Sequence, residues 1–260
     1  METISIITIC FNNLADVQKT CASVDTQTVH PFEHWIVNGS TNNEIANWLQ
    51  TTPQPAYRKW VNEKDKGIAD AFNKGIANAN GSIIHLLNSG DIYATNDILQ
   101  TVLNFFETNK TVQWVSGKIK IKRSSHWIEI GKPFDETQLY KGMRSVLHPT
   151  YFLRKEVYKN VGVFNLNYKI AMDYDLLCRL GKQRYQFINK TLIAFDDSGI
   201  SNTNYLQSLQ ENIAVYESHF GYSFKCRLWQ LRLKLLHHLL QTSLGKWLFT
   251  IKKNLKMENV

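Results

Sequence analysis

The residues best suited to chemistry follow a short buried segment. The apolar run over residues 83–87 is typical of a strand that is buried on both faces, and it ends in the turn Asn88-Ser89-Gly90-Asp91. In open α/β sheets, ligands bind beyond the carboxyl ends of such strands. A carboxylate there, Asp91, could hold a hard divalent metal ion that in turn holds phosphates. The alternative is that Ser89, Gly90 and Asp91 form only a turn, because all three residue types favour turns.

An alternation of strands and helices leads to this turn. Runs of β-branched and apolar residues predict strands over residues 4–9, 33–37 and 57–61. Apolar residues at helical spacing predict helices over residues 14–23, 43–50 and 67–78. Each strand ends in polar residues at the same edge, so we expect a parallel, doubly wound α/β sheet with its ligand site at that edge. The nucleotide-binding signatures GxGxxG and GxxxxGK[ST] are both absent.

The second half of the chain is less regular. Its patterns predict helices over residues 95–107, 155–160 and 173–180. They predict strands over residues 112–115, 117–122, 127–130, 147–153 and 187–195. Pro149 would lie at the entry of the strand over residues 147–153, and residues 136–144 are expected to form a loop. From Tyr205 onward the pattern is helical.

The composition is that of an ordinary globular protein. The chain has 260 residues, of which 43% are hydrophobic and 20% charged, so it can bury a sizeable core. Its four cysteines show no ligand spacing, so we expect neither a disulfide framework nor a zinc site, and they fit a reducing compartment. The N-terminus lacks the pattern of a signal peptide, and no stretch reaches the ~20 apolar residues that span a bilayer. We therefore expect a cytoplasmic protein.

The net charge of +8 is concentrated at the C-terminal end. Residues 222–260 carry eight Lys and Arg and one Glu, or +7, whereas the remaining 221 residues carry 22 basic and 21 acidic side chains. A near-neutral main part argues against a nucleic-acid-binding surface there. In the tail, Trp and Leu interleave with the basic residues, which is typical of a helix that lies on an anionic membrane surface. The alternative is a helical hairpin packed on the domain or on a second subunit of a homo-oligomer.

Four blocks, in order, resemble glycosyltransferase family 2, the inverting enzymes of GT-A fold. They are ISIITICFNN, HWIVNGSTNN, EKDKGIADAFNKGI followed by HLLNSGD, and LHPTYFLRKEVYKNVGVFNLNYKIAMDYDLLCRL. The resemblance covers roughly residues 3–205 and is strongest to transferases that build bacterial surface polysaccharides such as O-antigen, capsule and colanic acid. It implies an α/β, Rossmann-like and mostly parallel sheet flanked by helices, with a C-terminal helical tail.

The resemblance also implies how the chain is divided into domains and what each of them does. Residues 1–205 would form the GT-A domain, with a nucleotide-binding half (1–92) and an acceptor half (93–205), and residues 206–260 a basic amphipathic helical tail. The domain would move a hexosyl or N-acetylhexosaminyl group from a nucleoside diphosphate sugar, a UDP-sugar in particular. The acceptor would be a hydroxyl of a lipid-linked molecule or an oligosaccharide in polysaccharide synthesis, lipopolysaccharide included. Such a protein would be peripheral on the cytoplasmic face of the inner membrane.

The same resemblance assigns the catalytic groups. Asp91 matches the last position of the family's Asp-x-Asp motif, which binds Mn²⁺ or Mg²⁺, and Ser89 occupies the first position. One carboxylate with the substrate's phosphates can hold such an ion. Asp173 matches the aspartate that takes the acceptor's proton, and a positioned carboxylate suits that role. Asp175 is the rival, because side chains two residues apart on a helix point about 200° apart and only one can face the site.

The nucleotide contacts are implied in the same way. Asp65 matches the family position at the base ring, and Asn38 the position near the base or ribose. The other expected contacts of the nucleotide sugar are Phe11, Asn12, Lys66, Asn73, Asn88, Ser89, Gly90 and His148. The alternative for His148 is a structural hydrogen-bonding role. Asp196 or Asp197 lies in a segment that resembles the family's closing loop and could cover the diphosphate or reach the metal.

Two other functions stay open from the sequence. Ser89 replaces the first carboxylate of the metal motif, and Met172 replaces the Glu that precedes the family's base. These two replacements favour a relative that binds nucleotide sugars without turnover. The basic tail would also suit a nucleic-acid-binding protein, whose affinity would fall steeply with salt.

Overall fold

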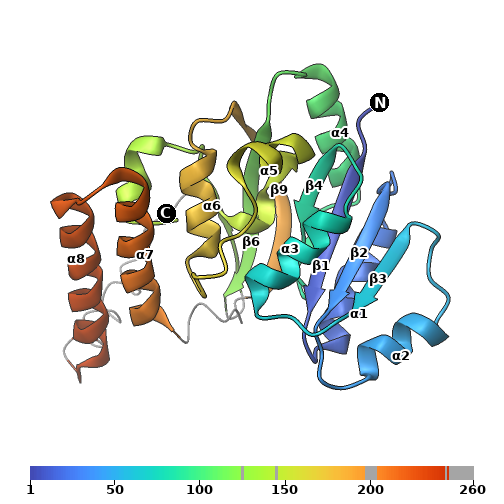
Figure 1. Ribbon diagram of the computed structural model, residues 1–260, viewed down its shortest axis with the longest axis horizontal. Coiled ribbons are helices and arrows are strands. Elements are labelled where there is room, and N and C mark those ends of the chain that lie inside the picture. Colours follow the sequence, from blue (N-terminus) through green and yellow to red (C-terminus); the bar gives the residue numbers. More distant parts are fainter. Residues whose placement is uncertain (124–125, 144–145, 197–203, 244, 246–260) are drawn as a thin grey trace.

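Strands and helices alternate through the first half of the chain, as predicted. The strands are β1 (Ile4–Cys10), β2 (Glu33–Asn38), β3 (Arg58–Asn62) and β4 (Ile83–Leu86). The helices are α1 (Leu14–Asp25), α2 (Glu44–Thr51) and α3 (Ile68–Asn78). The computed structural model describes residues 1–123, 126–143, 146–196, 204–243 and 245, and Figure 1 shows how its elements are arranged.

Shorter elements make up most of the second half. Its strands are β5 (Ile92–Tyr93), β6 (Trp114–Arg123), β7 (His126–Ile130), β8 (Phe152–Arg154) and β9 (Tyr185–Asp196). Its α-helices are α4 (Ile98–Thr108), α5 (Lys155–Val161), α6 (Met172–Leu180), α7 (Tyr205–Phe220) and α8 (Phe224–Gln241). Two 3-10 helices, η1 (Glu136–Lys141) and η2 (His148–Thr150), lie between them.

The strands form a single sheet whose order reverses beside β1. The order is β3-β2-β1-β4-β8-β6-β9-β5, with β7 paired to β6. The first four strands pair in parallel, as predicted, whereas β8 is antiparallel to both β4 and β6. Because the chain moves outward from β1 to β3 and then returns to the other side of β1 as β4, a switch point lies between β1 and β4. Open α/β sheets bind ligands at such a point.

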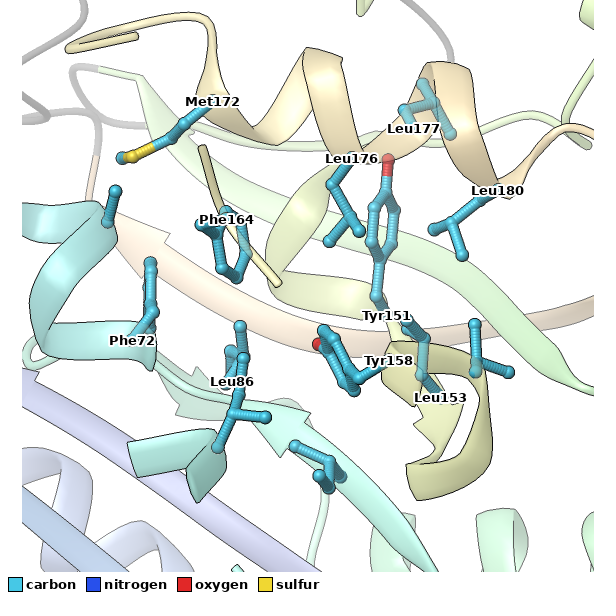
Figure 2. Packing of buried hydrophobic residues seen from close by; sticks show 14 of the residues in the cluster. Phe72, Leu86, Tyr151, Leu153, Tyr158, Phe164, Met172, Leu176, Leu177 and Leu180 are labelled. Atoms are coloured by element: carbon cyan, nitrogen blue, oxygen red, sulfur yellow. The ribbon is translucent and has the colours of Figure 1, made fainter. Parts of the chain in front are cut away.

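Two apolar layers cover the two faces of the sheet. Ile4 and Ile6 of β1 face the layer that includes α4, whereas Ile7 faces the layer built from α3, α5 and α6. This alternation is the period of two expected of a strand with both faces buried. Figure 2 shows the second layer, where Phe72 of α3 lies near Phe164 and Met172, at the start of α6. The layer therefore joins α3 of the first half of the chain to α6 of the second half.

Several segments differ from the sequence-based expectation, among them the two strands predicted over residues 112–115 and 117–122, which form the single strand β6. Residues 148–150 form η2, and β8 includes only Phe152–Arg154, so the strand predicted over residues 147–153 is wrong in its first part. Pro149 explains the difference, because it has no N–H to donate to a strand ladder. The segment 136–144, expected to be a loop, contains η1, and Leu139 of η1 is buried in the main core.

The C-terminal helices pack as a pair on α6 and η1. Helix α7 contacts α6, and α8 contacts both α7 and η1. Figure 1 shows α7 and α8 side by side at the end of the molecule opposite to β2 and β3. Val215 of α7 is fully buried and belongs to the same core cluster as α6. In the part of the chain that the structure describes, no helix is both long enough and apolar enough to cross a membrane.

Candidate active site

Asn12 binds the loop after β1 to the loop after β2. Its backbone φ is 53°, in the left-handed region that Asn tolerates better than most residues. The Asn12 Oδ1 atom accepts hydrogen bonds from the N–H groups of Thr41 (3.0 Å) and Asn42 (3.3 Å), and the Asn12 N–H donates to Ser40 Oγ (2.8 Å). The neighbouring Phe11 side chain is exposed. Asn12 therefore shapes this edge, while the ring of Phe11 is accessible to a ligand.

Asp65 and Asn38 come together at the ends of β2 and β3. A Cβ at Gly39 would overlap Asp65 Oδ2, so the carboxylate lies directly on the backbone that follows Asn38. The other carboxylate oxygen, Oδ1, accepts the N–H of Gly67 at 2.9 Å. Asn38 is buried; it donates to Asn62 Oδ1 at 2.8 Å and accepts the Ser40 N–H at 3.1 Å. The two residues expected near the nucleoside are thus neighbours.

The turn after β4 is held by helix α1 and the loop before it. Thr20 Oγ1 accepts the N–H of Gly90 (2.9 Å) and donates to the carbonyl oxygen of Asp91 (2.8 Å). Asn13 Nδ2 donates to Ser89 Oγ at 2.6 Å. Gly90 has a φ of +98°, a conformation that favours glycine. These bonds place the predicted Asn88–Asp91 turn beside the loop that follows β1.

Asp91 lies in a nearly buried position against α1. Burial raises the pKa of Asp91 to about 7; the charge of Lys19 and a hydrogen bond from the Asn88 side chain oppose this rise, and the charge of Asp16 adds to it. The Asn88 Oδ1 atom is buried and has no hydrogen-bond partner among the described residues. The turn therefore presents one carboxylate and one free amide oxygen.

These oxygens suit a hard metal ion, although they form no complete cage. In the described ranges, no group of three or more His, Cys, Asp and Glu residues could hold a metal. Mg²⁺ and Mn²⁺ prefer oxygen ligands and commonly take several of them from water and substrate phosphates. The Asp91 carboxylate and the Asn88 Oδ1 atom therefore fit an ion that is held mainly by a bound diphosphate.

Asp173, in the first turn of α6, lies next to His148. Its Oδ1 atom is 3.7 Å from His148 Nε2, and 23% of its side chain is exposed. The same Oδ1 atom is itself buried and accepts no hydrogen bond from the described residues. Burial raises the pKa of Asp173, and the nearby His148 partly opposes this rise. A carboxylate oxygen with a free lone pair and a raised pKa is the arrangement expected of a general base.

Asp175, the rival base, is occupied by two neighbours. Its Oδ1 atom lies 2.8 Å from His219 Nε2 of α7, and its Oδ2 atom accepts a bond of 2.7 Å from Arg179. The side chain is also buried. Both oxygens thus hold helices together, which leaves Asp173 as the candidate base.

A buried histidine of β4 positions the segment that carries His148. The Nε2 atom of His85 is 2.9 Å from the carbonyl oxygen of Pro149, so it must be the donor, because a carbonyl oxygen only accepts. His85 Nδ1 then accepts from the Tyr93 hydroxyl at 2.8 Å. Burial lowers the pKa of His85 to about 3, so the ring is neutral. His148 itself is enclosed by the rings of Phe72, Tyr151 and Phe164.

Some of the other predicted contacts hold neighbouring residues in place, and others are exposed to solvent. The Asn73 amide donates to the carbonyl oxygen of Phe164 (2.9 Å) and accepts its N–H (2.9 Å), so it fixes a residue that packs on His148. Lys66 is exposed beside Asp65. Lys74, by contrast, pairs with Glu63 at 3.0 Å and with Asp70 at 3.6 Å. Asp197 lies outside the described residues, and Asp196 is described only as the last residue of β9.

Three supporting residues were not identified from the sequence. Thr20 is a polar residue on the apolar face of α1, beside Val17 and Val24, and that exception in the pattern could have drawn attention to it. Gly39 is required by the close approach of Asp65, which no local pattern reveals. Glu211 of α7 accepts the N–H groups of Ile170 (2.8 Å) and Ala171 (2.9 Å) at the start of α6, and no sequence signal marks it.

Comparison with known proteins identifies the family. The family model described as "Glycosyl transferase family 2" matches residues 5–162, which is more than half of the chain. The chain belongs to glycosyl transferase family 2. The resemblance seen in the sequence is therefore confirmed, and with it the family's glycosyltransferase character.

Curated members of this family are similar over most of the chain. An uncharacterised glycosyltransferase of Mycobacterium tuberculosis strain H37Rv is 26% identical over 204 residues, which cover 77% of each chain. A PGL/p-HBAD biosynthesis glycosyltransferase of Mycobacterium bovis strain BCG Pasteur 1173P2 is 30% identical over 173 residues. That match covers 64% of this chain and 65% of the relative.

Solved structures of glycosyltransferases share the fold. S. aureus TarS matches with a TM-score of 0.61 at 15% identity, over 93% of this chain but only 44% of TarS. The mannosyltransferase PcManGT from Pyrobaculum calidifontis, solved with GDP-Man and Mn²⁺, matches with a TM-score of 0.60 at 14% identity, over 99% of this chain and 81% of its own. These matches confirm the predicted GT-A fold for this family 2 member.

Proposed function

We propose that this family 2 member is a metal-dependent, inverting glycosyltransferase of bacterial surface polysaccharide synthesis, lipopolysaccharide included. It moves a hexosyl or N-acetylhexosaminyl group from a nucleoside diphosphate sugar to a hydroxyl of a lipid-linked or oligosaccharide acceptor. The observation that carries this proposal is the Asp173 carboxylate, whose buried Oδ1 atom lies 3.7 Å from His148 and accepts no hydrogen bond from the described residues.

Asp173 is the base in this proposal. The acceptor hydroxyl donates a hydrogen bond to the exposed part of the Asp173 carboxylate and gives up its proton as its oxygen forms a bond to the anomeric carbon. The bond from that carbon to the diphosphate breaks on the opposite side, with the electron pair leaving on the diphosphate oxygen, so the anomeric centre inverts. The raised pKa of Asp173 makes it a stronger base than an exposed aspartate. His148 orients the carboxylate.

Asp91 and Asn88 are the residues that we propose to hold Mn²⁺ or Mg²⁺. When bound, such an ion would neutralise the charge of the leaving diphosphate as a Lewis acid. The structure of PcManGT in complex with Mn²⁺ and GDP-Man supports the choice of metal. Lys66, exposed beside Asp65, and the exposed ring of Phe11 complete the donor side.

The names and ligands of the relatives support the proposed donor and acceptor classes. S. aureus TarS was solved with UDP-GlcNAc, which supports a UDP-sugar donor placed against Asp65 and Asn38. The M. bovis relative is named for PGL/p-HBAD biosynthesis, which supports an acceptor carried on a lipid. A lipid-linked acceptor would place the enzyme as a peripheral protein on the cytoplasmic face of the inner membrane. Within it, residues 1–92 would bind the nucleotide, residues 93–205 the acceptor and residues 206–260 the membrane.

The test compares Asp173→Asn with the wild type. Radiolabelled UDP-GlcNAc, related UDP-sugars and GDP-Man are screened with Mn²⁺ for transfer and for slow hydrolysis, and by thermal shift for binding. We expect Asp173→Asn to lose roughly 10²–10⁴-fold in turnover. A donor present at about 100 times its Kd should still stabilise the variant by about 2.7 kcal/mol, as it does the wild type.

The outcomes separate the two candidate functions. Full turnover by Asp173→Asn would exclude Asp173 as the base. Donor binding by the wild type without any turnover would favour the alternative, a nucleotide-sugar-binding protein. This alternative is motivated by Ser89 and by the lack of a three-residue metal cluster among the described residues.

A further inference from the structure

Helix α8 has a buried face and, on the opposite side, an exposed apolar face. One face is buried against the rest of the protein through Cys226, Gln230 and Leu233. On the opposite side, five large side chains are exposed to between 42% and 68%: Phe224, Leu228, Leu231, Leu235 and Leu239. At 100° per residue these five form one stripe about 22 Å long. A contiguous apolar stripe of this kind on a protein surface marks a docking site.

Cations border this stripe on both sides. Toward η1, Lys225 Nζ lies 4.1 Å from the centre of the Tyr140 ring, and Arg232 Cζ lies 5.1 Å from the Trp229 ring. Lys141 of η1 reaches the same Trp229 ring at 5.1 Å. Lys234 lies on the other edge of the stripe. Two rings and three cations thus form one edge, which we call the η1 edge.

The cations of α8 are poorly compensated by acidic groups. Helix α8 contains no Asp or Glu. Its Arg227 pairs with Glu217 of α7 at 2.6 Å, but Lys225, Arg232 and Lys234 form no ion pair within the described ranges. At the η1 edge, Asp135 is the carboxylate near Lys141. The surface therefore combines exposed leucines with an excess of positive charge.

We propose that this outer face of α8 docks the protein on an anionic lipid bilayer. The stripe enters the boundary between headgroups and acyl chains, and the cations on both sides meet lipid phosphates, as in helices that lie in the membrane plane. Tyr140, partly exposed at the η1 edge, is an amphipathic ring of the kind that favours this boundary. The buried face of α8 stays packed on α7 and η1, so docking requires no unfolding.

A second copy of the chain fits the stripe less well. Two α8 helices that paired through their stripes would bring Lys225, Arg232 and Lys234 of one copy near the same residues of the other. No carboxylate of α8 could compensate them. Such like-charge contacts are unfavourable, whereas an anionic leaflet matches both the leucines and the cations.

Docking through α8 would also orient the candidate site. Helix α8 packs on η1, and the carbonyl oxygen of Leu139 in η1 accepts the Tyr174 hydroxyl at 2.5 Å. Tyr174 follows Asp173 in α6. The bilayer surface would thus be coupled to the acceptor half, where a lipid-linked acceptor would be used. This last consequence rests on the proposed function, whereas membrane docking does not.

The test is vesicle co-sedimentation of the full chain with neutral phosphatidylcholine vesicles and with vesicles that also contain phosphatidylglycerol. We expect binding only to the anionic vesicles, weakened by salt. The double variant Leu231→Gln/Leu235→Gln should bind the anionic vesicles about tenfold or more weakly. In the wild type both leucine side chains are removed from water on binding, and the variant loses this contribution. The affinity of Lys225→Gln/Arg232→Gln for the anionic vesicles should fall by about 25-fold, which is about fivefold for each charge removed. All four positions are exposed, so the fold should be retained.

Matched controls are Phe32→Gln, an exposed apolar residue just before β2, and Lys159→Gln on α5; both should bind as the wild type. Asp173→Asn should also bind as the wild type, so a failure of the proposed function would not affect this test. Equal vesicle binding by the wild type and the Leu231/Leu235 variant would overturn the proposal. The membrane proposal would also be overturned, in favour of a second copy, by a dimer seen in sedimentation equilibrium. That dimer would have to form without vesicle binding, and the Leu231/Leu235 variant would have to abolish it.

Discussion

Asp91 and Asp173 are carboxylates that burial makes harder to ionise. An enzyme that binds a diphosphate and removes a proton from an alcohol needs ionised carboxylates near those groups. Burying these carboxylates lowers the stability of the folded protein until substrate or metal binds. Asp175, only two residues from Asp173, has a different role because His219 and Arg179 occupy its oxygens. At the residue scale, the two carboxylates whose pKa burial raises are assigned to chemistry, and Asp175, with both oxygens bonded, is assigned to structure.

The pH dependence of stability should report the state of Asp91. Its pKa of about 7 in the folded protein exceeds the ordinary value near 4, so the folded state binds more protons between these pH values. The unfolding free energy therefore loses up to about 4 kcal/mol from this group as pH rises from 4 through 7. Asp91→Asn should remove that loss, so without metal it should gain stability over the wild type at pH 8 but not at pH 4.

Urea unfolding at several pH values, with EDTA present, checks this expectation. Asp97→Asn is the control, because the hydrogen bond from Lys190 lowers the pKa of Asp97 and its contribution is lost only as pH falls. Identical pH profiles for Asp91→Asn and the wild type would show that Asp91 is not held in this way. With Mn²⁺ and a UDP-sugar added, the variant should also lack the ligand-induced stabilisation of the wild type.

Gly39→Ala should weaken nucleotide binding more than it weakens the fold. The added Cβ would overlap Asp65 Oδ2 and push this carboxylate away from the Asn38 loop. We expect the Kd for UDP to rise by about tenfold, the equivalent of one charge-assisted hydrogen bond. Calorimetric titration measures it. Gly181→Ala is the matched control, because its Cβ would meet the end of the Glu136 side chain at 3.2 Å and the Cys178 carbonyl oxygen at an ordinary contact distance of 3.6 Å. An unchanged Kd in Gly39→Ala would remove Asp65 from the nucleotide site.

At the scale of elements, α7 acts as a clamp on α6. Glu211 accepts two N–H groups at the start of α6, and His219 binds Asp175 one turn further along. A carboxylate at a helix N-terminus satisfies free N–H groups and opposes the helix dipole. The orientation of the first turn of α6, where Asp173 lies, therefore depends on a helix some 40 residues later in the chain.

Glu211→Gln should lower both stability and turnover. Loss of the charge at the start of α6 should reduce the unfolding free energy by about 1 kcal/mol. Turnover should fall while the Kd for the donor changes little, because the variant acts on the position of Asp173 and not on the nucleotide half. Thermal unfolding and initial rates measure the two effects. Glu217→Gln, on the same helix but bonded to Arg227, is the control, and an equal loss of turnover in it would contradict the clamp.

At the scale of the whole molecule, the sheet edge proposed to bind the nucleotide and the helical pair α7–α8 are separate. Figure 1 shows α8 at the opposite end from β2 and β3, where Asn38 and Asp65 lie. Effects at distant sites without shared partners are usually additive. The two ends should therefore respond independently to mutation, with α6 between them.

Truncation after Tyr222 should reduce stability without affecting the donor. It removes α8 and exposes the surfaces of α7 and η1 that Cys226 and Leu233 cover. The Tm should fall, while the Kd for UDP should stay within about twofold of the wild-type value. Truncation after Thr242, which retains α8, is the matched control. A large rise of the Kd in the longer deletion alone would show that the two ends are coupled.

Local patterns predicted the first half of the fold well. Strands β1, β2 and β4 are rich in β-branched and apolar residues, and α3 has apolar residues at helical spacing, so local patterns were sufficient. The same reasoning was wrong at residues 148–150, where Pro149 interrupts an apolar run, and at residues 136–141, where a single buried leucine gives no period. Both segments take their structure from the core that they pack on.

The family, the alternation of the elements and the identity of the candidate residues could be predicted before the fold was known, because these depend on residue type and on order along the chain. The tertiary structure shows which of those residues meet. It brought Asp173 to His148, occupied Asp175 with α7, placed Asp65 on Gly39 and set the leucines of α8 outward. Contacts between residues far apart in sequence depend on how whole helices and strands pack, and no local pattern encodes that packing.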